Sequence, residues 1–179
     1  MKRLTLLAVL VGMLLALTAG VAVAKNISGT NGPDKLFGTG KADTINGKDG
    51  ADRIYGRGSA DTLKGNSGAD RLYGQDGADK LIGGNGDDLL RGGNGDDEIE
   101  GNIGVDTVTG DGGSDTINTV GDTSSDNVNC GEDANGQDVD TANVGSNDTV
   151  DGQQASTLVT TTVLSCEVVF VDGIQVPTI

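Results

Sequence analysis

A nine-residue period runs through the middle of the chain and constrains its fold more than any other feature. From Gly29 to Asn118 the sequence divides into ten consecutive units of nine residues without a gap. The eighth residue of every unit is Leu, Ile or Val, and the sixth is always Asp: Asp34, Asp43, Asp52, Asp61, Asp70, Asp79, Asp88, Asp97, Asp106 and Asp115. A strict repeat of this length is the signature of a solenoid or a related repeat architecture.

The pattern inside each unit predicts a turn followed by a short strand. Gly occupies the first position of every unit and the fourth position of all but two, where Lys41 and Ser59 stand. Glycine gives a turn access to positive φ, and the last three residues of a unit alternate outward, inward and outward as in a strand. If two units form one coil, equivalent residues recur every 18 positions and stack at about 4.8 Å. We therefore predict an all-β solenoid in which two parallel sheets face each other across one layer of aliphatic side chains.

This core is too thin to stabilise the fold by burial alone. Burying one aliphatic side chain per unit contributes about 1.5–3 kcal/mol, whereas ordering nine residues costs on the order of 10 kcal/mol of backbone entropy. The net charge is −15, and stacking brings the sixth-position carboxylates into register, where they repel one another. A divalent cation between successive turns would reverse that repulsion. Carboxylate and carbonyl oxygens are the ligands of Ca²⁺; Mg²⁺ accepts them but prefers to keep its waters, and zinc is disfavoured in a chain without His.

Two units carry the most complete pattern. They are Gly83-Gly84-Asn85-Gly86-Asp87-Asp88-Leu89-Leu90-Arg91 and Gly92-Gly93-Asn94-Gly95-Asp96-Asp97-Glu98-Ile99-Glu100. These units resemble the haemolysin-type (RTX) calcium-binding nonapeptide, G-G-x-G-x-D-x-U-x with U a large aliphatic residue, and the resemblance covers about half the chain. It implies a parallel β-roll, a right-handed two-sheet solenoid, with several Ca²⁺ ions held between turns. The metal ligands that it implies are Asp34, Asp52, Asp70, Asp79, Asp88, Asp97, Asp106 and Asp115, with Gly83, Asn85, Gly86, Gly92, Asn94 and Gly95 in the two clearest turns.

Asp43 and Asp61 are left out of this set. Lys41 and Ser59 replace the fourth-position glycine in two adjacent turns on the same edge of the roll, where Arg57 also stands. A non-glycine residue forced into a left-handed conformation costs about 1–3 kcal/mol, and nearby cations oppose a bound divalent ion. We therefore expect the site between the turns of Asp43 and Asp61 to be weak or empty. A metal-free alternative, in which each Asp caps its own turn, remains open.

Residues 1–24 predict a cleaved secretory signal peptide. Lys2 and Arg3 precede an apolar run from Leu4 to Leu17, and Ala22-Val23-Ala24 is a small-x-small cleavage site. The alternative is a transmembrane anchor, which needs about 20 apolar residues. We therefore expect a secreted, extracellular mature chain with no transmembrane anchor, in which residues 25–118 form the roll.

Residues 119–179 are less regular and predict degenerate repeats followed by a β-rich cap. The Asp-x-aliphatic element recurs in weakened form at Asp126-Asn127-Val128, Gln137-Asp138-Val139 and Asp148-Thr149-Val150. The segments 157–164 and 168–171, rich in Val and Thr, predict two longer β-strands. The end of a solenoid needs such a cap. Cys130 and Cys166 are the only cysteines, which in an exported chain predicts an intramolecular disulfide. A reactive thiol pair or intermolecular bridges are the alternatives.

Outward-facing residues 18 positions apart also line up on the predicted surface. The resulting ladders are Lys35, Arg53 and Arg71 beside Phe37, Tyr55 and Tyr73. Stacking and cation–π contacts between neighbouring strands are the simplest interpretation. A docking face for carbohydrate or a wall polymer is the alternative.

Composition narrows the function further. A chain without His has no Ser-His-Asp triad and no HExxH zinc site, and a net charge of −15 disfavours nucleic acid as a partner. An enzyme working with paired carboxylates is disfavoured because the repeat already accounts for the Asp clusters. We predict a secreted calcium-binding repeat protein that folds on Ca²⁺ and serves as a structural or interaction module. The alternative is a calcium-dependent adhesin or polysaccharide-binding module with a cell-surface glycan or protein as its partner.

Overall fold

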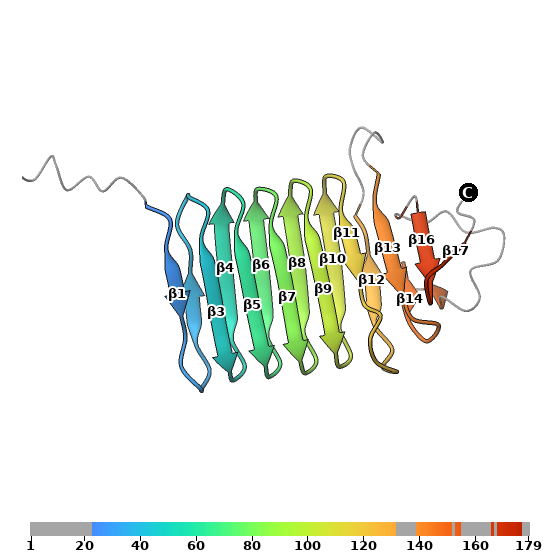
Figure 1. Ribbon diagram of the computed structural model, residues 1–179, viewed down its shortest axis with the longest axis horizontal. Helices are drawn as coiled ribbons and strands as arrows, with labels where there is room; N and C mark the ends of the chain where they lie inside the picture. Colours follow the sequence, from blue (N-terminus) through green and yellow to red (C-terminus); the bar gives the residue numbers. More distant parts are fainter. Residues whose placement is uncertain (1–22, 132–138, 152, 155–165, 167, 177–179) are drawn as a thin grey trace, which may run out of the picture.

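The computed structural model describes residues 23–131, 139–151, 153–154, 166 and 168–176, which form strands and turns with no helix. In Figure 1 the strands lie side by side along the long axis, from β1 at the N-terminal end to β16 and β17 at the C-terminal end. One sheet has the order β1 (Asn26–Ser28), β3 (Thr44–Asp49), β5 (Thr62–Ser67), β7 (Lys80–Asn85), β9 (Glu98–Ile103), β11 (Thr116–Asn118), β13 (Thr141–Val144), β16 (Val168–Val171) and β17 (Ile174–Val176). The other has the order β2 (Lys35–Phe37), β4 (Arg53–Gly58), β6 (Arg71–Asp76), β8 (Leu89–Asn94), β10 (Thr107–Gly112), β12 (Asn127–Asn129), β14 (Thr149–Val150) and β15 (Gln153–Gln154).

The chain passes from one sheet to the other at every turn, so two nine-residue units make one coil. From β1 to β11, neighbouring strands of a sheet are parallel and 18 residues apart in register, as in the pairing of Ile54 with Leu72 and of Leu72 with Leu90. This arrangement confirms the predicted all-β fold, a parallel β-roll of two sheets.

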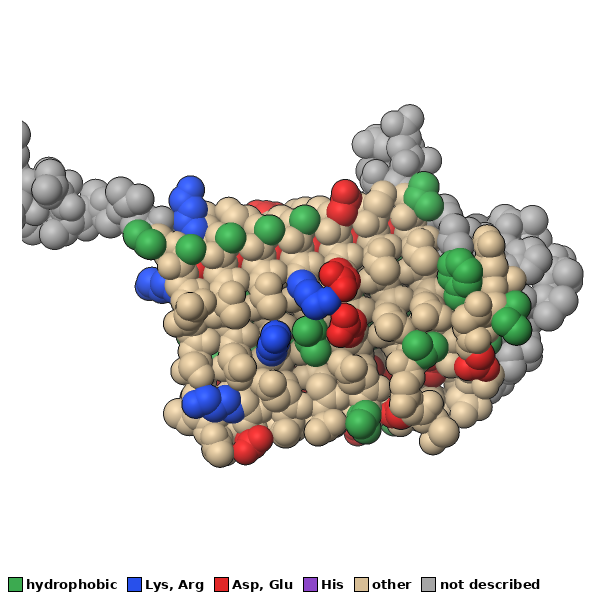
Figure 2. Space-filling view, in the orientation of Figure 1, with side chains coloured by type: hydrophobic (Ala, Val, Ile, Leu, Met, Phe, Trp, Pro, Cys, Tyr) green, Lys and Arg blue, Asp and Glu red, His purple; other side chains and the backbone are tan. Residues whose placement is uncertain are grey.

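The core is a single layer of aliphatic side chains between the two sheets. The eighth-position residues from the second unit onward are fully buried: Ile45, Ile54, Leu63, Leu72, Leu81, Leu90, Ile99, Val108 and Ile117. Ile27 and Leu36, which lie in the first coil of the described residues, are only partly buried. Figure 2 shows a row of hydrophobic side chains along the upper edge of the roll and charged side chains of both signs side by side near the middle of this face. Lys80 pairs with Glu98 and Glu100 on the neighbouring strand at 2.5 and 2.9 Å.

The roll continues beyond residue 118. Strands β12 and β13 add in parallel to β10 and β11, and β14 and β16 add in parallel to these. The parallel addition ends at β15 and β17, which pair in the antiparallel sense with β14 and β16. The strand predicted at 168–171 is confirmed, whereas the one predicted at 157–164 lies outside the described residues.

One predicted element of this region has the wrong register. Val139, which we expected at the aliphatic position, is 55% exposed, whereas Asp140 and Ala142 are buried. Ala142 therefore occupies the core position that Leu, Ile or Val takes in the other units. Because Ala is a weak signal for a core position, the sequence pattern placed the element at Val139. Asp138 lies outside the described residues.

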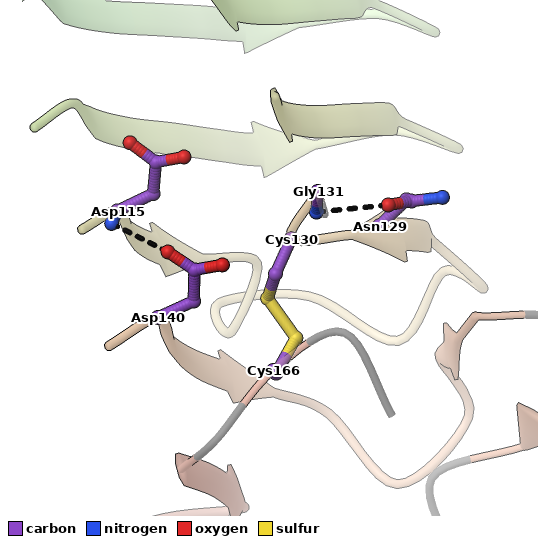
Figure 3. The surroundings of a disulfide bond; sticks show 6 residues. All are labelled: Asp115, Asn129, Cys130, Gly131, Asp140 and Cys166. Atoms are coloured by element: carbon purple, nitrogen blue, oxygen red, sulfur yellow. Dashed lines mark hydrogen bonds between the residues drawn. A yellow bond between two sulfur atoms is a disulfide. The ribbon is translucent and has the colours of Figure 1, made fainter. Parts of the chain in front are cut away.

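A disulfide ties the C-terminal part to the last coils of the roll. Cys130 follows β12 and bonds to Cys166, with their Cα atoms 5.3 Å apart, which confirms the predicted pairing (Figure 3). Both cysteines are buried and belong to the hydrophobic core. No helix among the described residues is long and apolar enough to cross a membrane.

Candidate metal sites

The sixth-position aspartates form two columns, one along each edge of the roll, and each links one coil to the next. From Asp52 to Asp115, the side-chain Oδ1 of each sixth-position Asp accepts a hydrogen bond from the backbone N–H of the Asp one coil earlier. Asp70 donates to Asp88 at 2.8 Å on one edge, and Asp79 donates to Asp97 at 2.7 Å on the other. The spacing of 18 residues places every such pair directly in register.

The second carboxylate oxygen is different. In the part of the chain that the structure describes, Oδ2 is buried and has no hydrogen-bond partner in Asp52, Asp61, Asp70, Asp79, Asp88, Asp97, Asp106 and Asp126. A buried charged oxygen without a partner is strongly unfavourable, so these atoms need a cation or a proton. The unpartnered oxygens along each edge therefore indicate that a cation or a proton from solution binds there.

The pKa values of these carboxyl groups show the same electrostatic problem. Burial, reinforced by the neighbouring aspartates, raises the pKa of Asp88 and Asp97 to about 7. Burial also raises the pKa of Asp61 and Asp106 to about 6, and that of Asp126 to about 7. The hydrogen bond from the earlier Asp N–H acts in the opposite direction but does not compensate.

Each turn leaves space for the carboxylate through its first-position glycine. A Cβ added to Gly56 would lie 2.5 Å from Oδ2 of Asp61 and 2.8 Å from the carbonyl oxygen of Gly74 in the next coil. A side chain at this position would fill the space in which a carboxylate oxygen and a backbone carbonyl converge. The invariant first-position glycine is therefore required by the site, besides its role in the turn.

The turns take left-handed backbone conformations at their second and fourth positions. Gly84 and Gly86 have φ of 119° and 124° in the turn that ends at Asp88. Lys48, Arg57 and Gln75 replace the second-position glycine yet keep φ of 84° to 87°. These turns therefore keep the geometry of the glycine turns although their sequences depart from the repeat pattern.

The first two turns are closed in another way. Thr30 and Thr39 occupy their second positions, and neither has positive φ. The Thr30 backbone N–H donates to Oδ2 of Asp34 at 2.6 Å, and the Thr39 N–H donates to Oδ2 of Asp43 at 2.5 Å. Burial would raise the pKa of Asp43, but the N–H groups of Thr39 and Lys25 outweigh it and lower that pKa. In these turns the carboxylate caps its own turn.

The structure thus distributes the predicted ligands unevenly. Asp52, Asp70, Asp79, Asp88, Asp97 and Asp106 share the buried, unpartnered Oδ2, and Asp115 is buried at the same position. The predicted ligand Asp34 has a different environment, because its Oδ2 accepts a hydrogen bond from the Thr30 N–H. Asp61, left out of the predicted set, has the same environment as its neighbours, and Ser59 in its turn takes φ of 70° despite its side chain.

The glycines and asparagines of the two clearest turns line the same edges. Gly83 and Gly92 are first-position glycines whose absent Cβ leaves room for Asp88 and Asp97, and Gly86 and Gly95 have positive φ. The side chains of Asn85 and Asn94 are exposed, and their carbonyl oxygens accept hydrogen bonds from the N–H groups of Gly68 and Gly77 at 2.8 Å. These two carbonyls therefore bond coil to coil.

Sequence reasoning missed Asp126 and Asp140 as members of the two columns. Asp126 accepts from the N–H of Asp106 at 2.8 Å, and Asp140 accepts from that of Asp115 at 2.7 Å (Figure 3). The spacings of 20 and 25 residues break the nine-residue period, which hid them. The Asp-x-aliphatic echo at 126–128 was the one signal available.

Carboxylates alone do not make these sites. Among the described residues, no group of three acidic or cysteine side chains converges on one point. A cation between turns would therefore need backbone carbonyl oxygens as well, such as the Gly74 carbonyl beside Asp61. Such all-oxygen donor sets fit Ca²⁺, which takes six to eight oxygen ligands in flexible geometry.

Comparison with known proteins agrees with this geometry. The family model of the RTX calcium-binding nonapeptide repeat, which spans four copies, matches residues 28–63, 55–90 and 82–117, so its matches together run from 28 to 117. No individual curated protein matches the chain.

Proposed function

Because this chain belongs to the RTX calcium-binding nonapeptide repeat family, we propose that it is a secreted module that folds when Ca²⁺ enters its stacked turns. The single observation that carries the proposal is the column of buried Oδ2 atoms that lack a partner among the described residues. The family accounts for calcium binding by the repeats; secretion and calcium-driven folding are the finer steps proposed here.

The residues that would hold the ions follow from the two columns. On one edge they are Asp52, Asp70, Asp88 and Asp106, and on the other Asp61, Asp79, Asp97 and Asp115, each with carbonyl oxygens of its own and the adjacent turn. When bound, Ca²⁺ supplies positive charge where carboxylates would otherwise repel. Asp34 and Asp43 contribute less in this proposal because Thr30 and Thr39 already bond their Oδ2 atoms.

Binding and folding would be one process in such a roll. The two columns come together only when the coils stack, so the unfolded chain has no preformed site. The free energy of binding then contributes directly to folding. A thin aliphatic core and a net charge of −15 give the chain little other means of staying folded.

Two features support secretion. The confirmed disulfide is of a kind that forms and persists in oxidising compartments outside the cytosol. The first 24 residues have the composition of a signal peptide. Extracellular calcium concentrations are also in the range that weak sites of this kind use. The β-roll, a fold built of coil-to-coil contacts, supports the proposal of a structural or interaction module.

A calcium titration followed by far-ultraviolet circular dichroism tests the proposal. The chain without its first 24 residues should show little β structure in calcium-free buffer and strong β structure in about 5 mM Ca²⁺. The same concentration of Mg²⁺ serves as the matched control and should have a much smaller effect, because Mg²⁺ demands octahedral geometry and keeps its waters. Identical spectra with and without Ca²⁺ would refute calcium-driven folding.

A further inference from the structure

The outer face of the second sheet carries a hollow that adjoins the turns ending at Asp79 and Asp97, since Gly92 and Asn94 also line it. Strands β6, β8 and β10 lie side by side there (Figure 1). Between their ends is a hollow of about 460 Å³, lined by side chains that include Tyr73, Gln75, Asp76, Arg91, Asn94 and Asp111. The hollow arises because Gly93 on β8 pairs in register with Gln75 on β6 and with Asp111 on β10. Gly93 has no side chain, so the row is interrupted at that strand.

An aromatic column ends at this hollow. Phe37, Tyr55 and Tyr73 lie on successive strands, with ring centroids 5.1 and 5.0 Å apart and interplanar angles of 14° and 9°. At the Phe37 end, Lys35 Nζ and Arg57 Cζ each lie 5.2 Å from the ring centroid. Among the described residues, no ring or cation is stacked on the opposite face of Tyr73.

The residue that would cover Tyr73 is held elsewhere. Arg91 is its register partner on β8 and is the next rung of the column. Its Nε and Nη2 donate to Oδ2 and Oδ1 of Asp111 at 2.6 and 2.9 Å, a bidentate pair. Bidentate geometry fixes the guanidinium plane. Arg91 is therefore paired with Asp111 on β10, whereas Tyr73 lies on β6, on the other side of β8.

Both hydrogen-bond donors and hydrogen-bond acceptors lie around the Tyr73 ring. The Asn94 side-chain amide donates to Asp76 Oδ1 at 2.7 Å, which fixes these two side chains relative to each other. Carboxylates accept hydrogen bonds, a guanidinium donates them, and the amides of Gln75 and Asn94 do both. An apolar platform with a few convergent polar groups is the usual make-up of a small-ligand site.

From this geometry we propose that the hollow binds a neutral sugar ring of a polysaccharide, packed against the Tyr73 ring. The C–H face of a pyranose is apolar and suits the face of an aromatic ring, while its hydroxyl groups both donate and accept. Asp76 and Asp111 disfavour phosphate or another anion, and the polar rim suits a hydroxyl-rich ligand better than an apolar one. The site rests on the proposed function in one respect, since it exists only when the roll is folded.

The chain offers a direct readout. It has no Trp and only two Tyr, Tyr55 and Tyr73, both of which line the hollow. Intrinsic tyrosine fluorescence therefore reports on this site alone. In about 5 mM Ca²⁺, titration with cellohexaose, chitohexaose and laminarihexaose should change the fluorescence with at least one of these neutral hexasaccharides.

Calorimetric titration of variants with the responding sugar then locates the site. Tyr73→Ala should weaken binding about tenfold, because it removes the stacking platform. Tyr73→Phe should bind nearly as well as the wild type. Phe37→Ala is the matched control, since it removes a ring from the other end of the same column and should leave the affinity unchanged. Asp76→Ala, in an exposed position, should weaken binding severalfold and serves where Tyr73→Ala does not fold.

Circular dichroism of each variant in Ca²⁺ separates the two proposals. A roll that fails to fold with calcium contradicts the proposed function. A folded roll whose fluorescence responds to none of the three sugars overturns the sugar site. So does an affinity that Tyr73→Ala and Asp76→Ala leave unchanged, or one that falls equally with Phe37→Ala.

Discussion

Asp88 accepts the backbone N–H of Asp70 through Oδ1 at 2.8 Å, while its Oδ2 remains buried with no partner among the described residues. One oxygen of the carboxylate thus completes the hydrogen bonding of the preceding coil, and the other creates a demand for positive charge. Removing the carboxylate would abolish both effects. The same division of roles recurs along both edges of the roll and underlies the predictions below.

Asp88→Ala should raise the calcium concentration at the folding midpoint severalfold, whereas Asp43→Ala should barely change it. The two aspartates are a matched pair, since both are 3% exposed. They differ in Oδ2, which is unpartnered in Asp88 and accepts the Thr39 N–H in Asp43. Calcium titrations followed by circular dichroism measure the two midpoints. Equal shifts would contradict the assignment of the Asp43 turn as a self-capped turn.

Gly56→Ala should destabilise the calcium-loaded roll by about 1–3 kcal/mol, the usual cost of overpacking. The new Cβ would lie 2.5 Å from Asp61 Oδ2, in the space that a bound ion needs beside it. Gly40→Ala, in the preceding turn of the same edge, is the control, because nothing lies within 4 Å of a Cβ there. Its effect should stay within about 0.5 kcal/mol. Thermal unfolding in Ca²⁺ measures the stability of both variants. Similar losses of stability would argue against an ion site beside Gly56.

Acidification should partly replace calcium. Burial raises the pKa of Asp88 and Asp97 to about 7 in the folded chain, above the ordinary value of about 3.9 for an unfolded Asp. The folded state therefore binds more protons than the unfolded state. Its metal-free stability is greatest below about pH 4 and is lost as the pH rises through about 6 to 7. Asp43, whose pKa is lowered, contributes with the opposite sign.

In calcium-free buffer we therefore expect more β structure at about pH 5 than at about pH 7.5. With Ca²⁺ present the dependence reverses, because protons compete with the ion for the same oxygens. Circular dichroism at both pH values, with and without Ca²⁺, gives the four measurements. A metal-free chain that gains no β structure on acidification would show that the buried carboxylates do not limit its folding.

Reduction of the Cys130–Cys166 bond should lower the thermal midpoint of the C-terminal part and leave calcium-induced folding of residues 29–118 largely intact. The bond closes a loop of 36 residues and should contribute about 3–4 kcal/mol by restricting the unfolded chain. Melting curves and calcium titrations of the oxidised and reduced chains provide the test. Loss of every calcium response on reduction would show that the two parts do not fold separately.

The repeat alone predicted most of the roll, because the period fixes which residues meet. A spacing of 18 residues places Tyr55 over Tyr73, and the rings are stacked as expected. The predicted cation ladder is also confirmed, with Arg53 in register between Lys35 and Arg71. These contacts depend on register only, and register can be counted along the sequence.

Counting along the sequence could not predict whether the carboxylate of a turn is capped by that turn or left unpartnered, because this depends on the backbone conformation of the turn. Lys48 and Arg57 take positive φ at the second position although each has a Cβ, whereas Thr30 and Thr39 do not. A β-branched residue strongly disfavours positive φ, which was the available physical signal. A β-branched residue at the second position distinguishes the first two turns from the later ones. The fourth-position residue does so less well, because it singles out the turns of Lys41 and Ser59.

The antiparallel strands β15 and β17 have a consequence for the size of the molecule. Among the described residues each sheet ends in an antiparallel strand, which interrupts the parallel stacking of coils. The length of the roll thus depends on the number of coils that precede β15 and β17. Insertion or deletion of 18 residues would lengthen or shorten the molecule by one step of about 4.8 Å and leave both ends unaltered. A change of nine residues would instead exchange the two sheets for every later strand. The repeat therefore acts as a ruler that can be reset only in whole coils.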